Sequence, residues 1–359
     1  MDRPVLIMAG GTGGHVFPGL AVAAALRARE VPVVWLGASG GMEEALVPQH
    51  GIPFEAIAVR GVRGKGVGGW AALPFRMLGA LRQARAVLRR RRPRSVVSFG
   101  GYAAGPGGLA AWLMRVPLVV HEQNAIAGLT NRVLARLARR ALCGFAGALP
   151  KSEWSGNPVR ATITALPTPE QRLAHRTGPL RLLVLGGSLG ARALNRVLPE
   201  LLAQWAAAGQ MLQVRHQCGA RLLDETRAAY AAAGLNVQPE AFIADMAAAY
   251  GEADLVLCRA GALTLAELCA AGVGSVLVPF PHAVDDHQTA NARALVEAGA
   301  AILLPESRLS ATTLQQQLAP LCADRALCVS MAQAARTLAR TDAAQRVAQA
   351  ALDVAGGAT

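Results

Sequence analysis

Two glycine-rich turns are the first feature of this sequence that could do chemistry. Residues 10–14 follow the apolar run Val5–Ala9, and residues 186–190 follow the apolar run Leu180–Leu185. In such a turn, backbone N–H groups can point at an anion, and the dipole of the following helix favours negative charge. Close packing of a helix on a strand also requires glycine, so one turn alone fits either role. Together the two turns favour a pair of nucleotide-binding units.

Polar side chains in the first half of the chain are candidates for acid–base chemistry. His15 comes directly after the 10–14 turn, where a helix N-terminus disfavours the imidazolium and leaves the ring able to act as a base. A histidine that hydrogen-bonds its own turn is the alternative. The polar run 121–124 follows an expected strand at 118–120, at the end where open α/β sheets bind ligands. A further glycine turn at 98–102 could hold a second phosphate group.

The second half of the chain offers groups suited to a nucleotide. Residues 260–267 follow an expected strand and place backbone N–H groups at a helix start, with Glu267 about one turn further on. A carboxylate there can accept two ribose hydroxyls, although it also compensates the helix dipole. A polar loop at 279–288 follows another expected strand. Asp285 and Asp286 are adjacent and no Asp-x-Asp occurs, so the sequence predicts no metal site.

Several classes of nucleotide-binding protein do not fit these turns. Neither turn ends in the Gly-Lys-Ser/Thr of a phosphate-binding loop, and neither is a G-x-G-x-x-G motif. No acidic residue closes a following strand as a clamp for the NAD ribose would. The six cysteines form no CxxC pair and no zinc-ligand spacing. The sequence therefore predicts neither ATP hydrolysis nor dehydrogenase chemistry, and it indicates no cofactor.

Length and strand spacing predict two α/β domains. A chain of 359 residues fits two domains of roughly 150–180 residues better than one core. Further buried parallel strands are expected at 33–36, 95–98 and 118–120 in the first half and at 213–216, 255–258 and 275–278 in the second. The expected domains are Rossmann-like, over 1–162 and 163–338. A helix at 339–359 packs either on the second domain or back on the first.

The basic excess of the chain lies entirely in its first half. Residues 1–160 hold 21 Lys and Arg against 7 Asp and Glu, a net charge of +14, whereas residues 161–359 hold 15 against 16. This asymmetry indicates an anionic partner for the first half, either membrane lipid, a phosphorylated substrate or nucleic acid, although arginine-rich composition alone raises the pI. Only 4% of residues are aromatic and no nucleic-acid motif is present, so we expect no nucleic-acid partner. No segment is typical of a signal peptide or a membrane span.

The motifs resemble those of one enzyme family, in order, along essentially the whole chain. They are GGTGGHVFPGLAVA at 10–23, HEQNAIAGLTN at 121–131, GNPVR at 156–160, GGSLGA at 186–191, AGALTLAEL at 260–268 and HAVDDHQTANA at 282–292. The set is similar to that of the peptidoglycan N-acetylglucosaminyltransferases that convert lipid I to lipid II. The resemblance implies two Rossmann-like domains facing across a cleft, the GT-B fold. It also implies inverting, metal-independent transfer of GlcNAc from UDP-GlcNAc to the C4 hydroxyl of undecaprenyl-diphospho-MurNAc-pentapeptide (lipid I).

Residue by residue, the resemblance implies a donor pocket. Ser188 and Arg160 would meet the donor diphosphate, Glu267 would hold the ribose, and the backbone of Ile243 would hold the uracil. The remaining donor contacts would come from Thr12, Gly13, Gly14, Asn124, Ala262, Leu263, Thr264, Leu265, Ala266 and Gln288.

The resemblance also implies an acceptor site and a general base. The acceptor diphosphate would lie at Gly100, Gly101 and Tyr102. His15 is the first candidate for the base that removes the C4 proton, and Glu122 is the second. Two other functions stay open: a GT-B transferase with another lipid acceptor, such as diacylglycerol, and a non-catalytic nucleotide-sugar binder.

An apolar segment in the basic half predicts contact with a membrane. It comprises residues 70–75 with Met77, Leu78 and Leu81, and the cations around it are Arg76, Arg82, Arg85 and residues 89–92. An apolar patch ringed by cations suits an anionic membrane surface, where each basic residue contributes about 1 kcal/mol. An ordinary amphipathic helix packed on the sheet is the alternative. We therefore expect a peripheral protein on the cytoplasmic face of the inner membrane.

Overall fold

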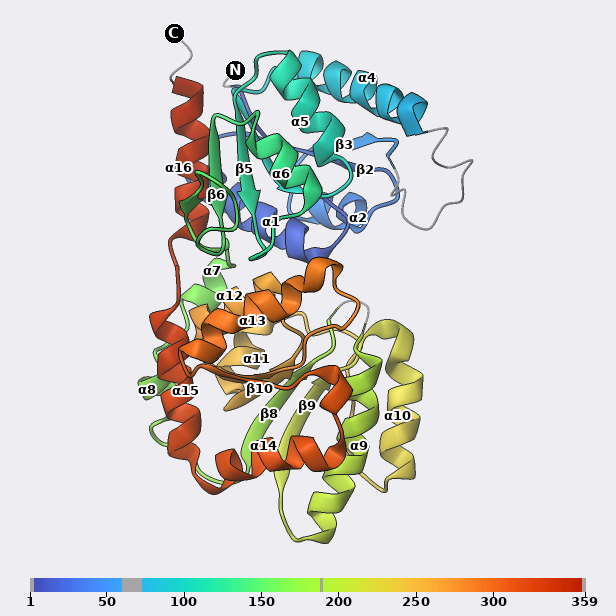
Figure 1. Cartoon of the computed structure of the whole chain (residues 1–359), viewed down its shortest axis with the longest axis vertical. Helices are drawn as coiled ribbons and strands as arrows, with labels where there is room; N and C mark the ends of the chain where they lie inside the picture. Colours follow the sequence, from blue (N-terminus) through green and yellow to red (C-terminus); the bar gives the residue numbers. More distant parts are fainter. Residues whose placement is uncertain (1–2, 60–72, 188–189, 357–359) are drawn as a thin grey trace. The chain divides into compact units, whose positions relative to one another are not determined.

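The computed structural model divides the chain into two compact units (Figure 1). The first unit comprises Met1–Arg160 and Thr341–Thr359, and the second comprises Ala161–Arg340. The structure describes residues 3–59, 73–187 and 190–356, with the side chains of all but 73–75 and 284. Ser188 and the start of the predicted apolar segment, residues 70–72, lie outside the described residues.

The first unit is a parallel sheet of seven strands in the order β3-β2-β1-β4-β5-β6-β7. Its strands are β1 (Val5–Ala9), β2 (Val33–Ala38), β3 (Phe54–Ile57), β4 (Ser95–Gly100), β5 (Leu118–Glu122), β6 (Arg140–Cys143) and β7 (Glu153–Trp154). Its helices are α1 (Gly13–Arg27), α2 (Met42–Gln49), α4 (Leu73–Arg91), α5 (Ala104–Leu113), α6 (Leu129–Ala135) and α16 (Ala343–Gly356).

Helices cover both faces of this sheet (Figure 1), which explains why its central strand β1 is apolar throughout. Side chains of successive strand residues point to opposite faces. Val5 and Ile7 therefore pack with α1 and α16 on one face. Leu6 and Met8 pack with α4, α5 and α6 on the other face. The C-terminal helix α16 thus completes the core of the first unit.

The second unit is a parallel sheet of five strands in the order β12-β11-β10-β8-β9. Its strands are β8 (Leu180–Leu185), β9 (Leu212–Gln217), β10 (Leu255–Cys258), β11 (Gly274–Leu277) and β12 (Ala301–Leu303). Its α-helices are α7 (Ala161–Thr164), α8 (Pro169–Leu173), α9 (Arg192–Ala207), α10 (Leu223–Ala232), α11 (Met246–Glu252), α12 (Ala262–Ala271), α13 (His287–Glu297), α14 (Ala311–Ala323) and α15 (Arg325–Thr337). Three short 3-10 helices are η1 (Ala220–Leu222), η2 (Val284–Asp286) and η3 (Glu306–Arg308).

Each sheet reverses its strand order beside its own first strand. In the first unit β2 and β4 flank β1, and in the second unit β9 and β10 flank β8. Ligands of open α/β sheets bind at such a reversal, outside the carboxyl ends of the strands. The turns after β1, β4 and β8, and the start of α12 after β10, all lie at these two points. The prediction of two Rossmann-like α/β domains is confirmed.

The structure corrects several local predictions. α1 begins at Gly13, so His15 lies in its first turn, although the apolar periodicity begins only at Leu20. His121 and Glu122 are the last residues of β5 rather than a loop, because hydrogen bonds to β6 extend the strand past its apolar part. The predicted C-terminal helix at 339–359 is α16, which begins only at Ala343, because a break at 338–342 separates it from α15. β3, β6, β7 and β12 were not expected, since they are short and all but β12 contain a charged residue.

Candidate functional site

The turns after β1 and β4 touch each other at the reversal point of the first sheet. Ala9 at the end of β1 pairs with Gly100 at the end of β4. Gly101 has a φ of +92°, and a Cβ built on it would lie 2.3 Å from the carbonyl oxygen of Gly10. Only glycine fits a position with that φ and that close an approach. The contact therefore joins the 10–14 turn to the proposed acceptor turn at Gly100–Tyr102.

A buried carboxylate that sequence analysis missed supports the 10–14 turn. Glu43 in the first turn of α2 is fully buried, and its Oε2 accepts a hydrogen bond of 3.1 Å from the Gly11 N–H. Its Oε1 accepts one of 3.1 Å from the Ala38 N–H. A Cβ on Gly10 or Gly41 would lie 2.1 or 2.5 Å from its carboxylate oxygens. These glycines make room for Glu43, which resembles an ordinary helix-start acid in the sequence.

A line of hydrogen bonds leads from Gly156, two residues after β7, through His121 and Gln123 to His15. The Nε2 of buried His121 lies 2.9 Å from the carbonyl oxygen of Gly156. Gln123 Nε2 donates to the His121 carbonyl oxygen at 2.9 Å and lies 3.2 Å from His121 Nδ1. Gln123 Oε1 lies 2.8 Å from Nδ1 of half-buried His15. Burial lowers the pKa of His121 to about 4, so its ring is neutral at pH 7.

Both oxygens of Glu122 are occupied by hydrogen bonds within the first unit. Glu122 is 1% exposed. Its Oε1 accepts from the backbone N–H and the side-chain amide of Asn124, at 2.9 and 3.2 Å. Its Oε2 accepts from Gly128 N–H at 3.2 Å and from Asn131 Nδ2 at 2.9 Å. The carboxylate thus fixes the loop that connects β5 to α6.

The other candidates of the first unit surround the start of α1. Thr12 is the exposed residue before α1, and its carbonyl accepts a hydrogen bond of 3.1 Å from His15 N–H. Arg160 lies over the ring of Phe17, with its guanidinium carbon 5.3 Å from the ring centroid. Tyr102 is 52% exposed. The structure thus places the proposed base, one proposed diphosphate ligand and the proposed acceptor turn around one helix start.

The proposed ribose carboxylate lies in α12 of the second unit. Glu267 is 4% exposed, and the hydroxyl of buried Tyr250 in α11 donates to its Oε2 at 3.1 Å. The residues predicted to hold the donor at 262–266 form the first turn of this helix. N–H groups in a first turn point out of the helix and toward any bound anion. Tyr250 was missed because nothing local marks it in the alanine-rich segment that contains it.

One buried amide connects the two other donor elements of this unit. Gln217 at the end of β9 accepts from Gly187 N–H at 3.0 Å and donates to the Gly187 carbonyl at 3.1 Å. The same side chain donates to the Ala241 carbonyl at 3.0 Å. Ala241 precedes Ile243, the predicted uracil contact, by two residues, and the side chain of Ile243 is buried. Gln217 therefore holds the 186–190 turn and the proposed uracil segment together.

Hydrogen bonds connect α13 and the loop before it to the carboxyl ends of β10 and β11. Gln288 Oε1 accepts from Phe280 N–H at 2.9 Å. Asn291, fully buried on the same helix, donates to the carbonyl oxygen of Ala260 at 3.2 Å. These contacts place Gln288 beside the strand end that α12 follows.

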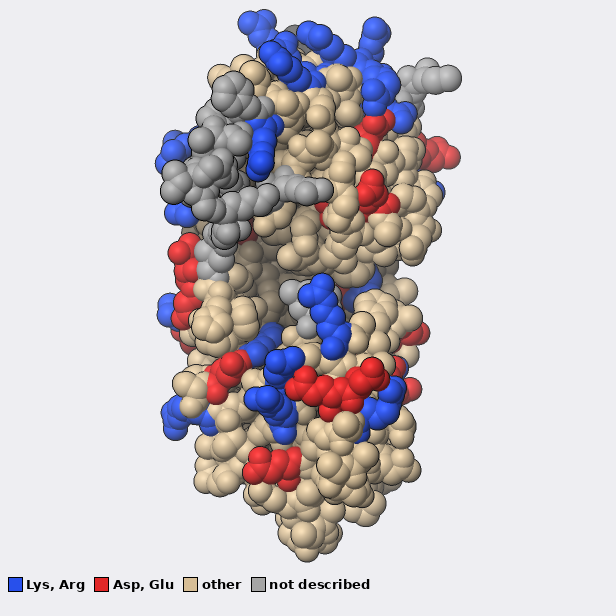
Figure 2. All heavy atoms as spheres, turned by 90° about the vertical axis from the view of Figure 1, so that its right-hand side faces the viewer, with Lys and Arg blue, Asp and Glu red and all other residues tan. Residues whose placement is uncertain are grey.

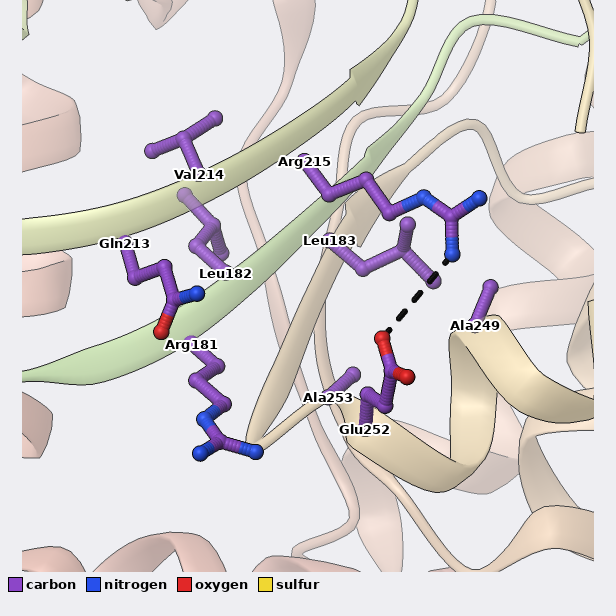
Figure 3. A pocket seen from close by; sticks show the side chains of 9 residues that line it. All are labelled: Arg181, Leu182, Leu183, Gln213, Val214, Arg215, Ala249, Glu252 and Ala253. Atoms are coloured by element: carbon purple, nitrogen blue, oxygen red, sulfur yellow. Dashed lines mark ion pairs between the residues drawn. The ribbon is translucent and has the colours of Figure 1, made fainter. Parts of the chain in front are cut away.

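Figure 3 shows a surface hollow of about 260 Å³ in the second unit, and none of the residues that line it belongs to the groups described above. Its walls are Arg181, Leu182, Leu183, Gln213, Val214, Arg215, Ala249, Glu252 and Ala253. Arg215 and Glu252 face each other there at 4.0 Å. The hollow opens beside the first half of β8, whereas the 186–190 turn follows the end of that strand. Among the described residues, no three His, Cys, Asp or Glu side chains gather as metal ligands would.

Two Rossmann-like units, each with a glycine turn at its strand reversal, define the class of two-domain nucleotide-binding α/β proteins. Residues 5–143 match the glycosyltransferase family 28 N-terminal domain, and residues 181–347 match the family 28 C-terminal domain. A relative from Xanthomonas axonopodis pv. citri (strain 306) is 62% identical over 99% of this chain and 83% of its own length. Its name is "UDP-N-acetylglucosamine--N-acetylmuramyl-(pentapeptide) pyrophosphoryl-undecaprenol N-acetylglucosamine transferase".

Two further relatives agree with this one. A protein of the same name from Xylella fastidiosa (strain M12) is 60% identical over 98% of this chain and 96% of its own length. The crystal structure of Acinetobacter baumannii MurG superposes with a TM-score of 0.83 at 43% identity, covering 98% of this chain and all of that one. The chain therefore belongs to glycosyltransferase family 28 and, within it, to the family of these N-acetylglucosamine transferases. The family expected from the motifs is confirmed.

Proposed function

We propose that this chain transfers GlcNAc from UDP-GlcNAc to the C4 hydroxyl of undecaprenyl-diphospho-MurNAc-pentapeptide. The names of its relatives describe this donor and this acceptor. The observation that carries the proposal is the placement of the family's motifs. The GGTGGH, GGSLGA and AGALTLAEL segments and the Gly100 turn all follow strands that flank a reversal of strand order. That is where an open α/β sheet binds its ligands.

His15 is the proposed general base. Its Nδ1 faces Gln123, so Nε2 is the nitrogen left to take the C4 proton. As that proton moves to Nε2, the acceptor oxygen attacks the anomeric carbon. The bond from that carbon to the diphosphate breaks, and UDP leaves with the electron pair. Glu122, the second candidate, has both oxygens engaged in loop contacts, and we propose that it anchors the loop instead.

Donor recognition is divided among the remaining groups. We expect the start of α12, Ser188 and Arg160 to meet the negative charge that develops on the leaving diphosphate. Glu267 would accept the ribose hydroxyls, oriented by Tyr250. Gln288 and the backbone of Ile243 would complete the pocket. Ser188 has this role by its motif alone, because it lies outside the described residues.

A transfer assay with purified protein tests the proposal. Radiolabelled UDP-GlcNAc is offered with a lipid I analogue and, separately, with diacylglycerol. We expect label only in the lipid I analogue. Transfer to diacylglycerol would instead support the alternative of another lipid acceptor, and no transfer to either would support a non-catalytic binder.

We also propose that the outer surface of α4 and α5 binds an anionic membrane. α4 buries Ala80, Ala84 and Leu88 against the sheet, as an amphipathic helix does. On the outer side Met77 and Leu78 are 37% and 45% exposed. On α5, which packs beside α4, Trp112 and Leu113 are 48% and 49% exposed.

Exposed cations lie along α4 and directly after it. Figure 2 shows Lys and Arg side chains gathered at one end of the first unit. Arg76, Arg82, Arg85, Arg89 and Arg92 are exposed, whereas Arg90 and Arg91 form ion pairs with Glu55. Among the described helices, none combines the length and the apolar character that crossing a bilayer requires. The surface therefore suits peripheral attachment, which we propose is to the cytoplasmic face of the inner membrane.

Vesicle co-sedimentation tests the membrane proposal. We expect binding to vesicles that contain phosphatidylglycerol and much weaker binding to neutral phosphatidylcholine vesicles. The double substitution Met77→Ser and Leu78→Ser should weaken binding. The control Leu327→Ser replaces a similarly exposed apolar residue of the second unit. It should not weaken binding to the vesicles. Equal binding to both vesicle types would refute the electrostatic part of the proposal.

A further inference from the structure

We propose that Gln123, oriented by His121, is a positioning residue that holds His15 in the tautomer with its proton on Nδ1. This inference deepens the proposed function, since it rests on His15 as the base. A neutral imidazole carries its proton on one nitrogen and a lone pair on the other. Only a lone pair on Nε2 can accept the proton of the acceptor hydroxyl, because Nδ1 faces Gln123.

The argument begins at His121, whose tautomer is defined by a backbone carbonyl. The Gly156 oxygen can only accept, so His121 Nε2 must carry a proton to bond it at 2.9 Å. His121 has no exposed surface, and its burial favours the neutral ring. Its Nδ1 therefore has a lone pair. That nitrogen presents an acceptor to the amide of Gln123, 3.2 Å away.

The amide of Gln123 then has one possible orientation. On its inner side it meets two acceptors, the His121 carbonyl oxygen at 2.9 Å and His121 Nδ1. Its NH2 group must face them, so its oxygen faces His15. Gln123 is 1% exposed, and its own carbonyl accepts from Asn157 Nδ2 at 2.9 Å. The side chain is therefore buried, and the two His121 acceptors determine its orientation.

The oxygen of Gln123 in turn specifies the proton on His15. An amide oxygen only accepts, so His15 Nδ1 must donate across 2.8 Å, and Nε2 keeps its lone pair. When Nε2 gains the substrate proton, the same hydrogen bond becomes charge-assisted and stronger. Gln123 thus favours both the reactive tautomer and the cation that forms from it. The chain of donors and acceptors runs in one direction from Gly156 to His15.

The other groups near these hydrogen bonds do not determine which nitrogen of His15 is protonated. Glu122 adjoins His121, but its oxygens accept from Asn124, Gly128 and Asn131. Arg160, which directly precedes α7, lies over the ring of Phe17 in α1. The backbone at Gly100 faces His15, where a Cβ would lie 3.5 Å from the ring carbon Cε1. None of these groups offers an acceptor to His15 Nδ1.

Two substitutions of Gln123 distinguish a role in positioning His15 from a role in stabilising the fold alone. Gln123→Met keeps the approximate volume of the side chain and removes its three hydrogen bonds, one to His15 and two to His121. We therefore expect kcat to fall roughly 3- to 10-fold with KM for UDP-GlcNAc unchanged. Gln123→Glu keeps an acceptor facing His15 and adds a negative charge. That charge should move the acid limb of the kcat pH profile upward by roughly 1–3 pH units. Gln83→Glu is the control, because its amide accepts a backbone N–H that a carboxylate can also accept, and we expect neither change.

The tautomer itself is measurable without turnover. In 15N-labelled resting protein, we expect the His15 ring to show a protonated Nδ1 and an unprotonated Nε2, and Gln123→Met to mix the two tautomers. A protonated Nε2 in the unsubstituted protein would overturn the inference. So would a Gln123→Met protein that loses only thermal stability and keeps the kcat and tautomer of the parent. If His15→Ala keeps a normal kcat, the base assignment fails while the tautomer measurement still tests Gln123.

Discussion

Replacing Glu122 by Gln separates a loop anchor from a general base. Each carboxylate oxygen accepts two hydrogen bonds, from donors on Asn124, Gly128 and Asn131. In Glu122→Gln an amide nitrogen replaces one oxygen and faces two donors. Two hydrogen bonds to a charged acceptor are then lost, each worth about 1.5–3 kcal/mol. We therefore expect the free energy of unfolding to fall by at least about 3 kcal/mol.

Thermal unfolding and turnover, measured on the same Glu122→Gln protein, show whether Glu122 is a loop anchor or the general base. For a domain of roughly 150–250 residues, 1 kcal/mol corresponds to roughly 2–4 °C, so the Tm of the first unit should fall by roughly 6–12 °C. At a temperature where the variant is folded, kcat should fall much less than in His15→Ala. The control Glu153→Gln removes an exposed partner of Arg140 and should cost less than about 1 kcal/mol. An unchanged Tm with kcat abolished would refute the anchor role and make Glu122 the base.

Three other substitutions or conditions test separate parts of the account. Gly101→Ala introduces a Cβ at a φ of +92° and 2.3 Å from a carbonyl oxygen, so we expect at least about 2 kcal/mol of destabilisation by urea unfolding and a higher KM for the acceptor. Tyr250→Phe removes the hydroxyl that orients the proposed ribose carboxylate, so KM for UDP-GlcNAc should rise roughly 3- to 10-fold. Tyr230→Phe is its control in the same unit, and equal effects of the two would contradict the ribose role. Burial lowers the pKa of His121 and His216 from 6.5 to about 4, so the unfolded chain binds more protons between these values. The free energy of unfolding should fall as pH drops from 6.5 toward 4, by about 3 kcal/mol per histidine, and a flat pH profile there would contradict this.

The glycine turns and their strands could be predicted because the signals are local. An apolar run, a glycine turn and a helical segment are adjacent in the sequence, and β1 and β8 begin and end where expected. His15 and Glu267 were found because they adjoin such turns. The resemblance to a known family then supplied roles that no local pattern specifies.

The supporting contacts could not be predicted, because they join distant parts of the chain. Glu43 reaches the 10–14 turn from 32 residues away, and Gln123 reaches His15 from 108 residues away. Gln217 binds Gly187 across 30 residues. Each is a side-chain hydrogen bond that depends on which strands are neighbours.

The polar run 121–124 shows both what a pattern can predict and where it stops. Its position at a strand end was predicted, but its residues were treated as one polar loop. β5 extends through Glu122, so neighbouring side chains point to opposite sides. His121 and Gln123 lead to His15, whereas Glu122 fixes the loop before α6.

The most direct test of the account is the structure of the product. Purified protein is incubated with UDP-GlcNAc and a soluble lipid I analogue, and the new linkage is determined by NMR while UDP release is counted. We predict one UDP released for each GlcNAc joined to the C4 oxygen of MurNAc, with the anomeric configuration inverted. A product with retained configuration, or UDP release without a new linkage, would contradict single-step transfer with His15 as the base.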